Sequence, residues 1–159
     1  MITKPILHVE DEENDIFLVQ LAFQKAGVRV PLINVRDGES AIDYLAGRGR
    51  FADRWEYPLP GLVLLDLNLP GKSGIEVLRW LRKQPALDSL VVLLFSSSNL
   101  QRDIRNAFAA GANAYLVKPP GLEELVEIVR SIRDFWIEQS HTPELVEHFS
   151  GNWNVVFAD

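Results

Sequence analysis

The sequence predicts a doubly wound α/β fold built on a sheet of five parallel strands. Three observations lead to this prediction: five short apolar runs recur along the chain, stretches with helical spacing separate them, and polar residues directly follow several of the runs. Apolar runs without alternation are typical of parallel strands whose two faces are both covered. Regular alternation of strand and helix is the pattern of an open sheet with helices on both faces.

The strands are expected at the five apolar runs, which span residues 6–9, 32–35, 61–65, 90–95 and 114–117. Helices are predicted between them from apolar residues at helical spacing: Ile16, Val19, Leu21 and Phe23 before the second run, and Ile75, Leu78 and Leu81 before the fourth. The segment Ser73-Gly74-Ile75-Glu76 has the pattern of a capping box, so a helix should begin there. A last long helix has an apolar stripe of Leu122, Leu125, Val129, Ile132 and Trp136.

Two segments stand outside this pattern, a loop from about residue 47 to residue 60 and a tail beyond residue 137. We therefore expect a domain over residues 1–138 and a C-terminal extension over residues 139–159. Thr142-Pro143-Glu144 predicts a helix start, with Thr as the cap and Pro at the first helical position. The apolar residues of the tail either pack on their own domain or form a contact with a partner or a second copy.

The composition excludes several classes of function. The net charge is -6 and the basic residues are scattered, so direct binding to nucleic acid is not expected. The absence of cysteine excludes a disulfide framework, a thiol nucleophile and a zinc-thiolate site. The longest apolar runs are far too short to cross a bilayer and the first residues lack an apolar signal region, so we expect a cytoplasmic protein that does not contact a membrane.

Polar side chains follow the predicted strands at the edge where ligands bind in open parallel sheets. They are Glu10 and Asp11, Asp66, Ser96, and Lys118. Carboxylates that converge at one edge repel one another unless a cation lies among them. Because no histidine or cysteine accompanies them, a hard divalent ion such as Mg²⁺, completed by phosphate oxygens, suits this set, and Mn²⁺ is the alternative ion.

Asp66 is the residue of this set that can react with phosphate. An aspartate can attack a phosphoryl group to form an aspartyl-phosphate, whose charge then needs metal, ammonium and hydroxyl partners. Lys118 and Ser96 are of the right kind. Taken singly, each residue also has a plain structural reading: Glu10 and Asp11 as acids at a helix N-terminus, Ser96 as part of a polar loop, and Lys118 as surface charge.

The motifs together resemble the response regulator receiver domains of two-component signalling, over roughly residues 4 to 138. The resemblance rests on Val9-Glu10-Asp11, on Leu65-Asp66-Leu67-Asn68-Leu69-Pro70 with Gly74, on Ser96-Ser97, and on Tyr115-Leu116-Val117-Lys118-Pro119. It implies a flavodoxin-like fold and a phosphoprotein that a histidine kinase phosphorylates on Asp66. It also implies Mg²⁺ bound by Asp11, Asp66 and the main-chain carbonyl of Asn68, with Glu10 acting through water.

The same resemblance assigns the remaining site residues. Ser96, with Ser97 beside it, matches the hydroxyl that turns toward the phosphoryl group, and Lys118 matches its salt-bridge partner. Tyr115 matches the aromatic residue whose rotation reports the switch, although taken alone it is a half-buried core aromatic. Pro119 matches a proline that is typically cis. This chain departs from the common pattern in having Glu10 in place of aspartate and Ser96 in place of threonine.

A narrower resemblance is to the single-domain regulators that serve bacterial and cyanobacterial phytochrome kinases. It rests on the loop over residues 47–60, on Leu-Asp-Leu-Asn-Leu-Pro and on Phe135-Trp136. It implies a sensor histidine kinase, such as a bacteriophytochrome, as one partner, a downstream protein as another, and a homodimer. A protein of this kind is not an enzyme, because it assists only its own phosphorylation and dephosphorylation.

Two other functions fit parts of the sequence. A haloacid dehalogenase-type aspartyl phosphatase also uses Mg²⁺ and an aspartate at a strand end, but it usually needs a second acid two residues on, where this chain has Asn68. A pseudo-receiver that only binds partners is the other alternative, although Asp66 and Lys118 are both present. The three histidines, His8, His141 and His148, show no ligand or triad spacing and are interpreted as structural.

Overall fold

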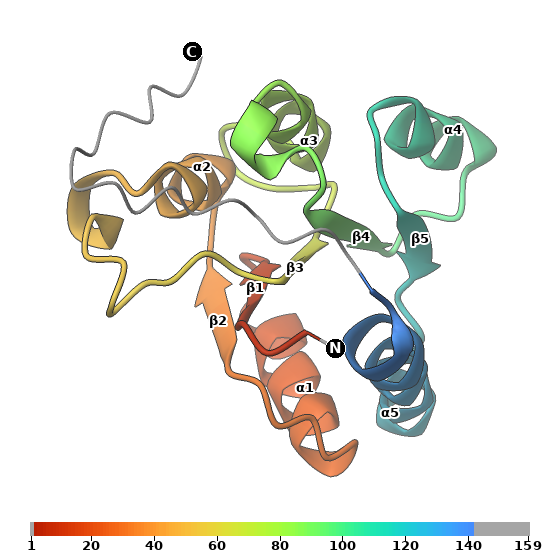
Figure 1. Cartoon of the computed structure of the whole chain (residues 1–159). Coiled ribbons are helices and arrows are strands. Elements are labelled where there is room, and N and C mark those ends of the chain that lie inside the picture. Colours follow the sequence, from red (N-terminus) through yellow and green to blue (C-terminus); the bar gives the residue numbers. More distant parts are fainter. Residues whose placement is uncertain (1, 142–159) are drawn as a thin grey trace.

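A central parallel sheet organises the computed structural model, which describes residues 2–141 (Figure 1). Its five strands lie in the order β2-β1-β3-β4-β5, and every neighbouring pair is parallel. They are β1 (Ile6–Val9), β2 (Leu32–Val35), β3 (Leu62–Leu65), β4 (Val91–Ser96) and β5 (Ala114–Val117). The predicted fold class is confirmed, and three of the five strands begin and end at the predicted residues.

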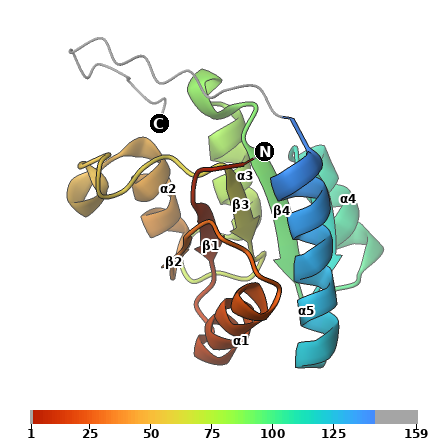
Figure 2. The same cartoon turned by 60° about the horizontal axis from the view of Figure 1, so that its bottom comes forward.

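Helices cover both faces of the sheet. The α-helices are α1 (Glu13–Lys25), α2 (Gly38–Ala46), α3 (Gly74–Arg82), α4 (Gln101–Ala109) and α5 (Leu122–Ser131), and two short 3₁₀ helices are η1 (Gly49–Phe51) and η2 (Pro85–Leu87). Helices α1 and α5 lie on one face, while α2, α3 and α4 lie on the other (Figures 1 and 2). None of the helices within residues 2–141 is long and apolar enough to span a membrane.

The strands divide their side chains between two apolar layers. In β1, Leu7 and Val9 pack in the layer under α2 and α3, whereas Ile6 packs in the layer under α1 and α5. This division follows from the strand geometry, because successive side chains point to opposite faces. Both layers are therefore apolar, which explains why the strands read as continuous apolar runs rather than as alternating ones.

The register of the strands brings their carboxyl ends together. Val9 is aligned with Val35 on one side and with Leu65 on the other, so the residues that follow β1 and β3, Glu10 and Asp66, are neighbours. The backbone N–H of Asp66 donates to Val9 O at 3.1 Å. At the other side of the sheet, Lys118 N donates to Ser96 O at 2.8 Å. The ladder thus places all four residues at one edge.

Two helix starts hold the loops at this edge. Ser73 caps α3 and accepts from Glu76 N, while the Glu76 carboxylate accepts from Ser73 N at 2.7 Å, so the predicted capping box is confirmed. The first residue of α3 must be glycine, because a Cβ at Gly74 would lie 2.1 Å from Asp66 O. The close approach of α3 to the end of β3 fixes the backbone that carries Asp66.

The loop between α2 and β3 is held together by Arg54. Its guanidinium donates to the carbonyl oxygens of Tyr44, Leu45 and Tyr57 at 2.7, 2.8 and 3.1 Å, respectively. The rings of Tyr44, Phe51 and Tyr57 pack on one another beside it. The loop, which the sequence left without secondary structure, therefore contains the short helix η1 and an aromatic cluster.

Arg54→Met should destabilise the fold, because it leaves three partly buried carbonyl groups without their charged donor. Hydrogen bonds to charged groups are each worth about 1.5–3 kcal/mol, and part of this is recovered from water, so we expect a loss of about 2–4 kcal/mol in the free energy of unfolding. Urea unfolding followed by circular dichroism measures it. Arg48→Met is the control, because Arg48 is exposed on the same loop, and an equal loss in both variants would contradict this role for Arg54.

The last helix continues beyond α5 as a π-helix, η3 (Ile132–Gln139), in which Ile132 and Ile137 are buried. Ile2 N donates to Ile137 O at 2.7 Å, so the start of the described chain lies beside η3 (Figure 2). The predicted stripe thus extends over α5 and η3, with Leu125 and Val129 buried. The predicted helix start at Thr142 and most of the C-terminal extension lie outside the described residues.

The predicted cis peptide bond before Pro119 is wrong, because no peptide bond within residues 2–141 is cis. The trans form of an X-Pro bond is favoured by about 0.5–1 kcal/mol, so a cis bond needs a local reason. Here the trans chain already lets Lys118 N pair with Ser96 O and lets the Lys118 side chain reach the acids at the sheet edge.

Candidate functional site

An ammonium group lies at the centre of the acidic edge. Lys118, which follows β5, donates from Nζ to Glu10 Oε1 at 3.0 Å, to Asp15 Oδ2 at 2.9 Å and to Asp66 Oδ2 at 2.8 Å. An ammonium group has three protons, so each has one carboxylate partner. Lys118 therefore supplies the positive charge that the converging acids require.

Burial makes these contacts strong. Glu10 is 1% exposed and Asp66 is 7% exposed. An uncompensated charge at such a position would cost several kcal/mol, so the pairing of the acids with Lys118 is a condition of the fold as well as of the site. The pairing also fixes the Asp66 carboxylate in one orientation, because Asn68 N donates to its other oxygen, Oδ1, at 3.2 Å.

The pKa values of the two buried carboxyl groups shift in opposite directions. Burial raises the pKa of Glu10 to about 9, and its hydrogen bond with Asp66 adds to this shift. Burial acts in the same direction on Asp66, but the hydrogen bonds from Glu10 and Lys118 outweigh it and hold the pKa of Asp66 below its usual value. Burial lowers the pKa of Lys118, but its bonds to Asp66 and Asp15 outweigh that effect and raise it. These shifts favour the protonated form of Glu10 and the charged forms of Asp66 and Lys118.

The donor atoms around Asp66 fit a hard metal ion. Glu10 Oε2 is buried and has no hydrogen-bond partner, Asp11 is exposed at the same edge, and all available donors are oxygen atoms. Within residues 2–141, however, no three His, Cys, Asp or Glu side chains are gathered as a ready metal-binding group. The reason is visible in the contacts, since Glu10 and Asp66 converge on Lys118. The predicted metal ligands therefore remain a prediction.

The hydroxyl residues predicted for the switch lie on the loop after β4. Ser96 is fully buried and its Oγ accepts from Ser98 N at 3.2 Å, whereas Ser97 is exposed. Half-buried Tyr115 donates from its hydroxyl to Ser98 O at 2.7 Å. Ser98 in turn donates to Asp103 at the start of α4. Tyr115 thus ties β5 to the loop that carries the hydroxyl residues.

Sequence reasoning missed Asp15 and Ser98. Asp15 lies in the first turn of α1, four residues after Asp11, and this short separation was the signal that could have placed it at the edge. Ser98 stands in a run of three serines, where spacing alone does not separate the roles.

His8 is buried in β1 and its Nδ1 has no hydrogen-bond partner. Burial, with a smaller effect of Lys118, lowers its pKa to about 4, so the imidazole is neutral at physiological pH. Within residues 2–141, His8 forms no hydrogen bond with another histidine. His141 is the last described residue and is exposed, and His148 lies outside the described residues. The structural interpretation of these histidines stays a prediction.

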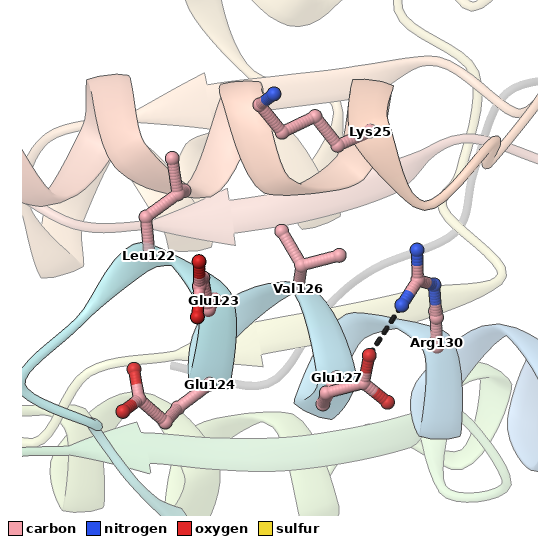
Figure 3. A pocket seen from close by; sticks show the side chains of 7 residues that line it. All are labelled: Lys25, Leu122, Glu123, Glu124, Val126, Glu127 and Arg130. Atoms are coloured by element: carbon pink, nitrogen blue, oxygen red, sulfur yellow. Dashed lines mark hydrogen bonds and ion pairs between the residues drawn. The ribbon is translucent and has the colours of Figure 1, made fainter.

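A groove between α1 and α5 is separate from the acidic edge. Figure 3 shows its lining, in which Glu127 and Arg130 form an ion pair. The other lining residues are Lys25, Leu122, Glu123, Glu124 and Val126. None of the predicted site residues is among them.

Comparison with known proteins decides the family. The family model described as the response regulator receiver domain matches residues 6–130, over all five strands. The chain belongs to the response regulator receiver family. The matched range includes the acidic edge of this receiver domain, with Asp66 after β3 and Lys118 after β5.

Several solved response regulators are similar to this receiver domain. The response regulator RPA3017 of R. palustris, described as acting in red light signaling, is 40% identical with a TM-score of 0.85, and the match covers 89% of this chain and 99% of that one. The phosphorylated cyanobacterial phytochrome response regulator RcpA is 37% identical with a TM-score of 0.82, over 89% and 99% of the two chains.

Response regulator Rcp1 of Synechocystis sp. is 36% identical over 140 residues, which cover 88% of this receiver domain's chain and 93% of that protein. The Mn²⁺-bound form of Rcp1 has a TM-score of 0.79, at 35% identity over 89% and 99% of the two chains. The chain is thus related to phytochrome response regulators along nearly its whole described length.

Proposed function

We propose that this receiver domain accepts a phosphoryl group on Asp66 from a histidine kinase, in a Mg²⁺-dependent reaction. The observation that carries the proposal is the state of Asp66: its carboxylate stands at the end of the central strand β3, is held by Lys118 and Asn68, and has a lowered pKa. A carboxylate kept ionised and oriented is a nucleophile that is ready for an incoming phosphorus atom.

The transfer balances without any further reactant. An Asp66 oxygen forms a bond to phosphorus, the bond between phosphorus and the imidazole nitrogen of the donor breaks, and the imidazole leaves with that electron pair. The product is an acyl phosphate. The Lys118 ammonium, already 2.8 Å from Asp66, then donates to the phosphoryl oxygens, and the Ser96 hydroxyl is the second donor.

The metal is assigned to the carboxylates of Asp11 and Asp66 and the main-chain carbonyl of Asn68, with Glu10 acting through water. When bound, Mg²⁺, or Mn²⁺ in its place, neutralises charge on the transferring oxygens. Among the protein groups, Glu10 supplies a buried oxygen that has no other partner, which suits a bound ion or its water. Asp11 supplies an exposed carboxylate at the entrance.

The signal leaves the site through the loop after β4. When Ser96 turns toward the phosphoryl group, Ser98 on the same loop shifts with it, and the hydroxyl of Tyr115 loses or changes its partner there. Phosphorylation in this way biases a two-state element. Ser97 is the exposed neighbour that follows this movement, and α4 begins directly after the loop.

The partners that we propose are a sensor histidine kinase of the bacteriophytochrome kind and a downstream protein, with no contact to nucleic acid or membrane. The support is the similarity to regulators described in red-light and phytochrome signalling. We further propose that residues 139–159 form an extension that contacts a partner or a second copy in a homodimer, and that the protein works in the cytoplasm as a non-enzymatic switch.

Phosphorylation by acetyl phosphate tests the proposal. With Mg²⁺, intact-mass spectrometry should detect one added phosphoryl group, and fragmentation after reductive trapping should locate it on Asp66. Asp66→Asn should remain unmodified, because an amide is not a nucleophile of this kind. Phosphotransfer from candidate kinases then identifies the donor. A phosphoryl group on another residue, or none with either donor, would overturn the mechanism, while steady turnover of a small phosphomonoester would favour the phosphatase.

A further inference from the structure

Lys118 has a third carboxylate partner that the proposed reaction does not require. Asp15 Oδ2 lies 2.9 Å from Lys118 Nζ, as close as the oxygens of Glu10 and Asp66. Glu10 and Asp66 stand on the sheet, at the ends of β1 and β3, but Asp15 stands on the first turn of α1. One helix on the surface of the domain therefore holds the ammonium group of the site directly.

The position of Asp15 is fixed by the start of its helix. Glu12 caps α1, and its carboxylate accepts from Asp15 N at 2.8 Å and from Asn14 N at 3.2 Å. The capped turn fixes the backbone from which the Asp15 side chain extends. Helix α1 itself packs on α5, which helps to hold this turn in place.

Asp15 is also the most accessible of the three partners. Its side chain is 34% exposed, against 1% for Glu10 and 9% for Asp66. A negative charge at the mouth of the site acts on any anion that approaches Asp66 and attracts any cation that approaches it.

All three protons of the ammonium are already engaged. A phosphoryl group on Asp66 needs donors from Lys118, and every proton that stays on Asp15 is one that the phosphoryl oxygens do not receive. Asp15 therefore competes with the phosphoryl group for the same ammonium, and its own charge repels that group.

We propose that Asp15 is a positioning residue which holds the Lys118 ammonium toward α1 and so weakens the binding of the phosphoryl group at Asp66. The inference rests on the proposed function of Asp66.

Asp15→Asn tests this inference, because it removes the charge and keeps the size. The probes are beryllofluoride, which mimics the phosphoryl group, and Mg²⁺ alone, both followed by calorimetry. At saturating Mg²⁺, beryllofluoride should bind roughly threefold to tenfold more tightly, the effect of one charge at this distance in a solvated site. Mg²⁺ alone should bind roughly twofold to threefold more weakly for the same reason. A change in packing would not give effects of opposite sign.

Two further variants complete the experiment. Glu13→Gln removes the same charge from the same turn, but Glu13 is 84% exposed and pairs with Arg36, so both affinities should stay within a factor of two of wild type. Asp15→Glu keeps the charge and should restore wild-type affinities. If Asp15→Asn matches Glu13→Gln, or binds beryllofluoride more weakly, the inference is wrong. If the wild type binds no beryllofluoride, the proposed function of Asp66 fails instead.

Discussion

Lys118→Met is expected to destabilise the protein without divalent ions and at the same time to increase its affinity for Mg²⁺. The ammonium has three carboxylate partners at 2.8 to 3.0 Å, two of them buried. Removing one member of a buried ion pair typically costs about 3–5 kcal/mol, because the remaining charge is left uncompensated. We expect a loss of that order in the free energy of unfolding.

The gain in Mg²⁺ affinity has the same origin. In the wild type, a metal ion that enters beside Asp66 approaches a positive charge that already neutralises the acids. In Lys118→Met the carboxylates of Asp66 and Asp15 lose their positive partner, and a divalent ion supplies the missing charge. Mg²⁺ should therefore restore part of the lost stability, in proportion to its occupancy of the site.

Urea unfolding with and without Mg²⁺ measures both effects in one series. Lys83→Met is the matched control, because Lys83 is exposed at the end of α3 and makes no described contact with the acids. That variant should lose less than about 0.5 kcal/mol, the usual range for a surface substitution. A Lys118→Met protein as stable as the control, or one that binds Mg²⁺ more weakly than wild type, would contradict the geometry of the site.

Mg²⁺ affinity should rise steeply with pH, up to about pH 9. Burial and the hydrogen bond with Asp66 raise the pKa of Glu10 to about 9, so at neutral pH the metal must displace a proton. For competition with one proton, the affinity increases by up to about tenfold per pH unit below that pKa and is constant above it. Calorimetry in two buffers with different ionisation enthalpies should detect close to one proton released per ion at pH 7.

The same pKa shift should make the metal-free protein less stable as the pH rises. The pKa of Glu10 is higher in the folded chain than the ordinary glutamate value of 4.5, so the folded state binds this proton more tightly. Its contribution to stability is complete below about pH 4.5 and is lost as the pH rises toward 9. Glu10→Gln keeps a hydrogen-bond donor at this position but cannot titrate. In this variant, both the Mg²⁺ affinity and the stability should lose this dependence on pH. A Mg²⁺ affinity that stays flat between pH 6 and pH 9 in the wild type would show that Glu10 is already ionised.

The strands and their edge could be predicted because they depend on local sequence. A short apolar run that is covered on both faces has few alternatives to a central parallel strand. The run at Ile6–Val9 forms β1 at the predicted residues. Once the strands are parallel, the residues after them must meet, which brings Glu10, Asp66 and Lys118 to one edge. The capping box at Ser73 was equally local.

The contacts of the site depended on packing between elements that are distant in the sequence. Asp15 and Lys118 are 103 positions apart in the sequence, and their contact depends on how α1 packs against the sheet. The three carbonyl partners of Arg54 and the contacts of Ser98 also depend on packing, because no rule of sequence spacing specifies them. At Pro119 the prediction failed because the trans chain already satisfies its neighbours.

The strand order also predicts which part of the domain opens last. Asp66 follows β3, which is paired on both sides, by β1 and by β4. In native-state hydrogen exchange, central strands of this kind open last, with the free energy of global unfolding, whereas edge strands and surface helices open earlier. We therefore expect the backbone at the end of β3, which carries Asp66, to exchange more slowly than β5 and α4.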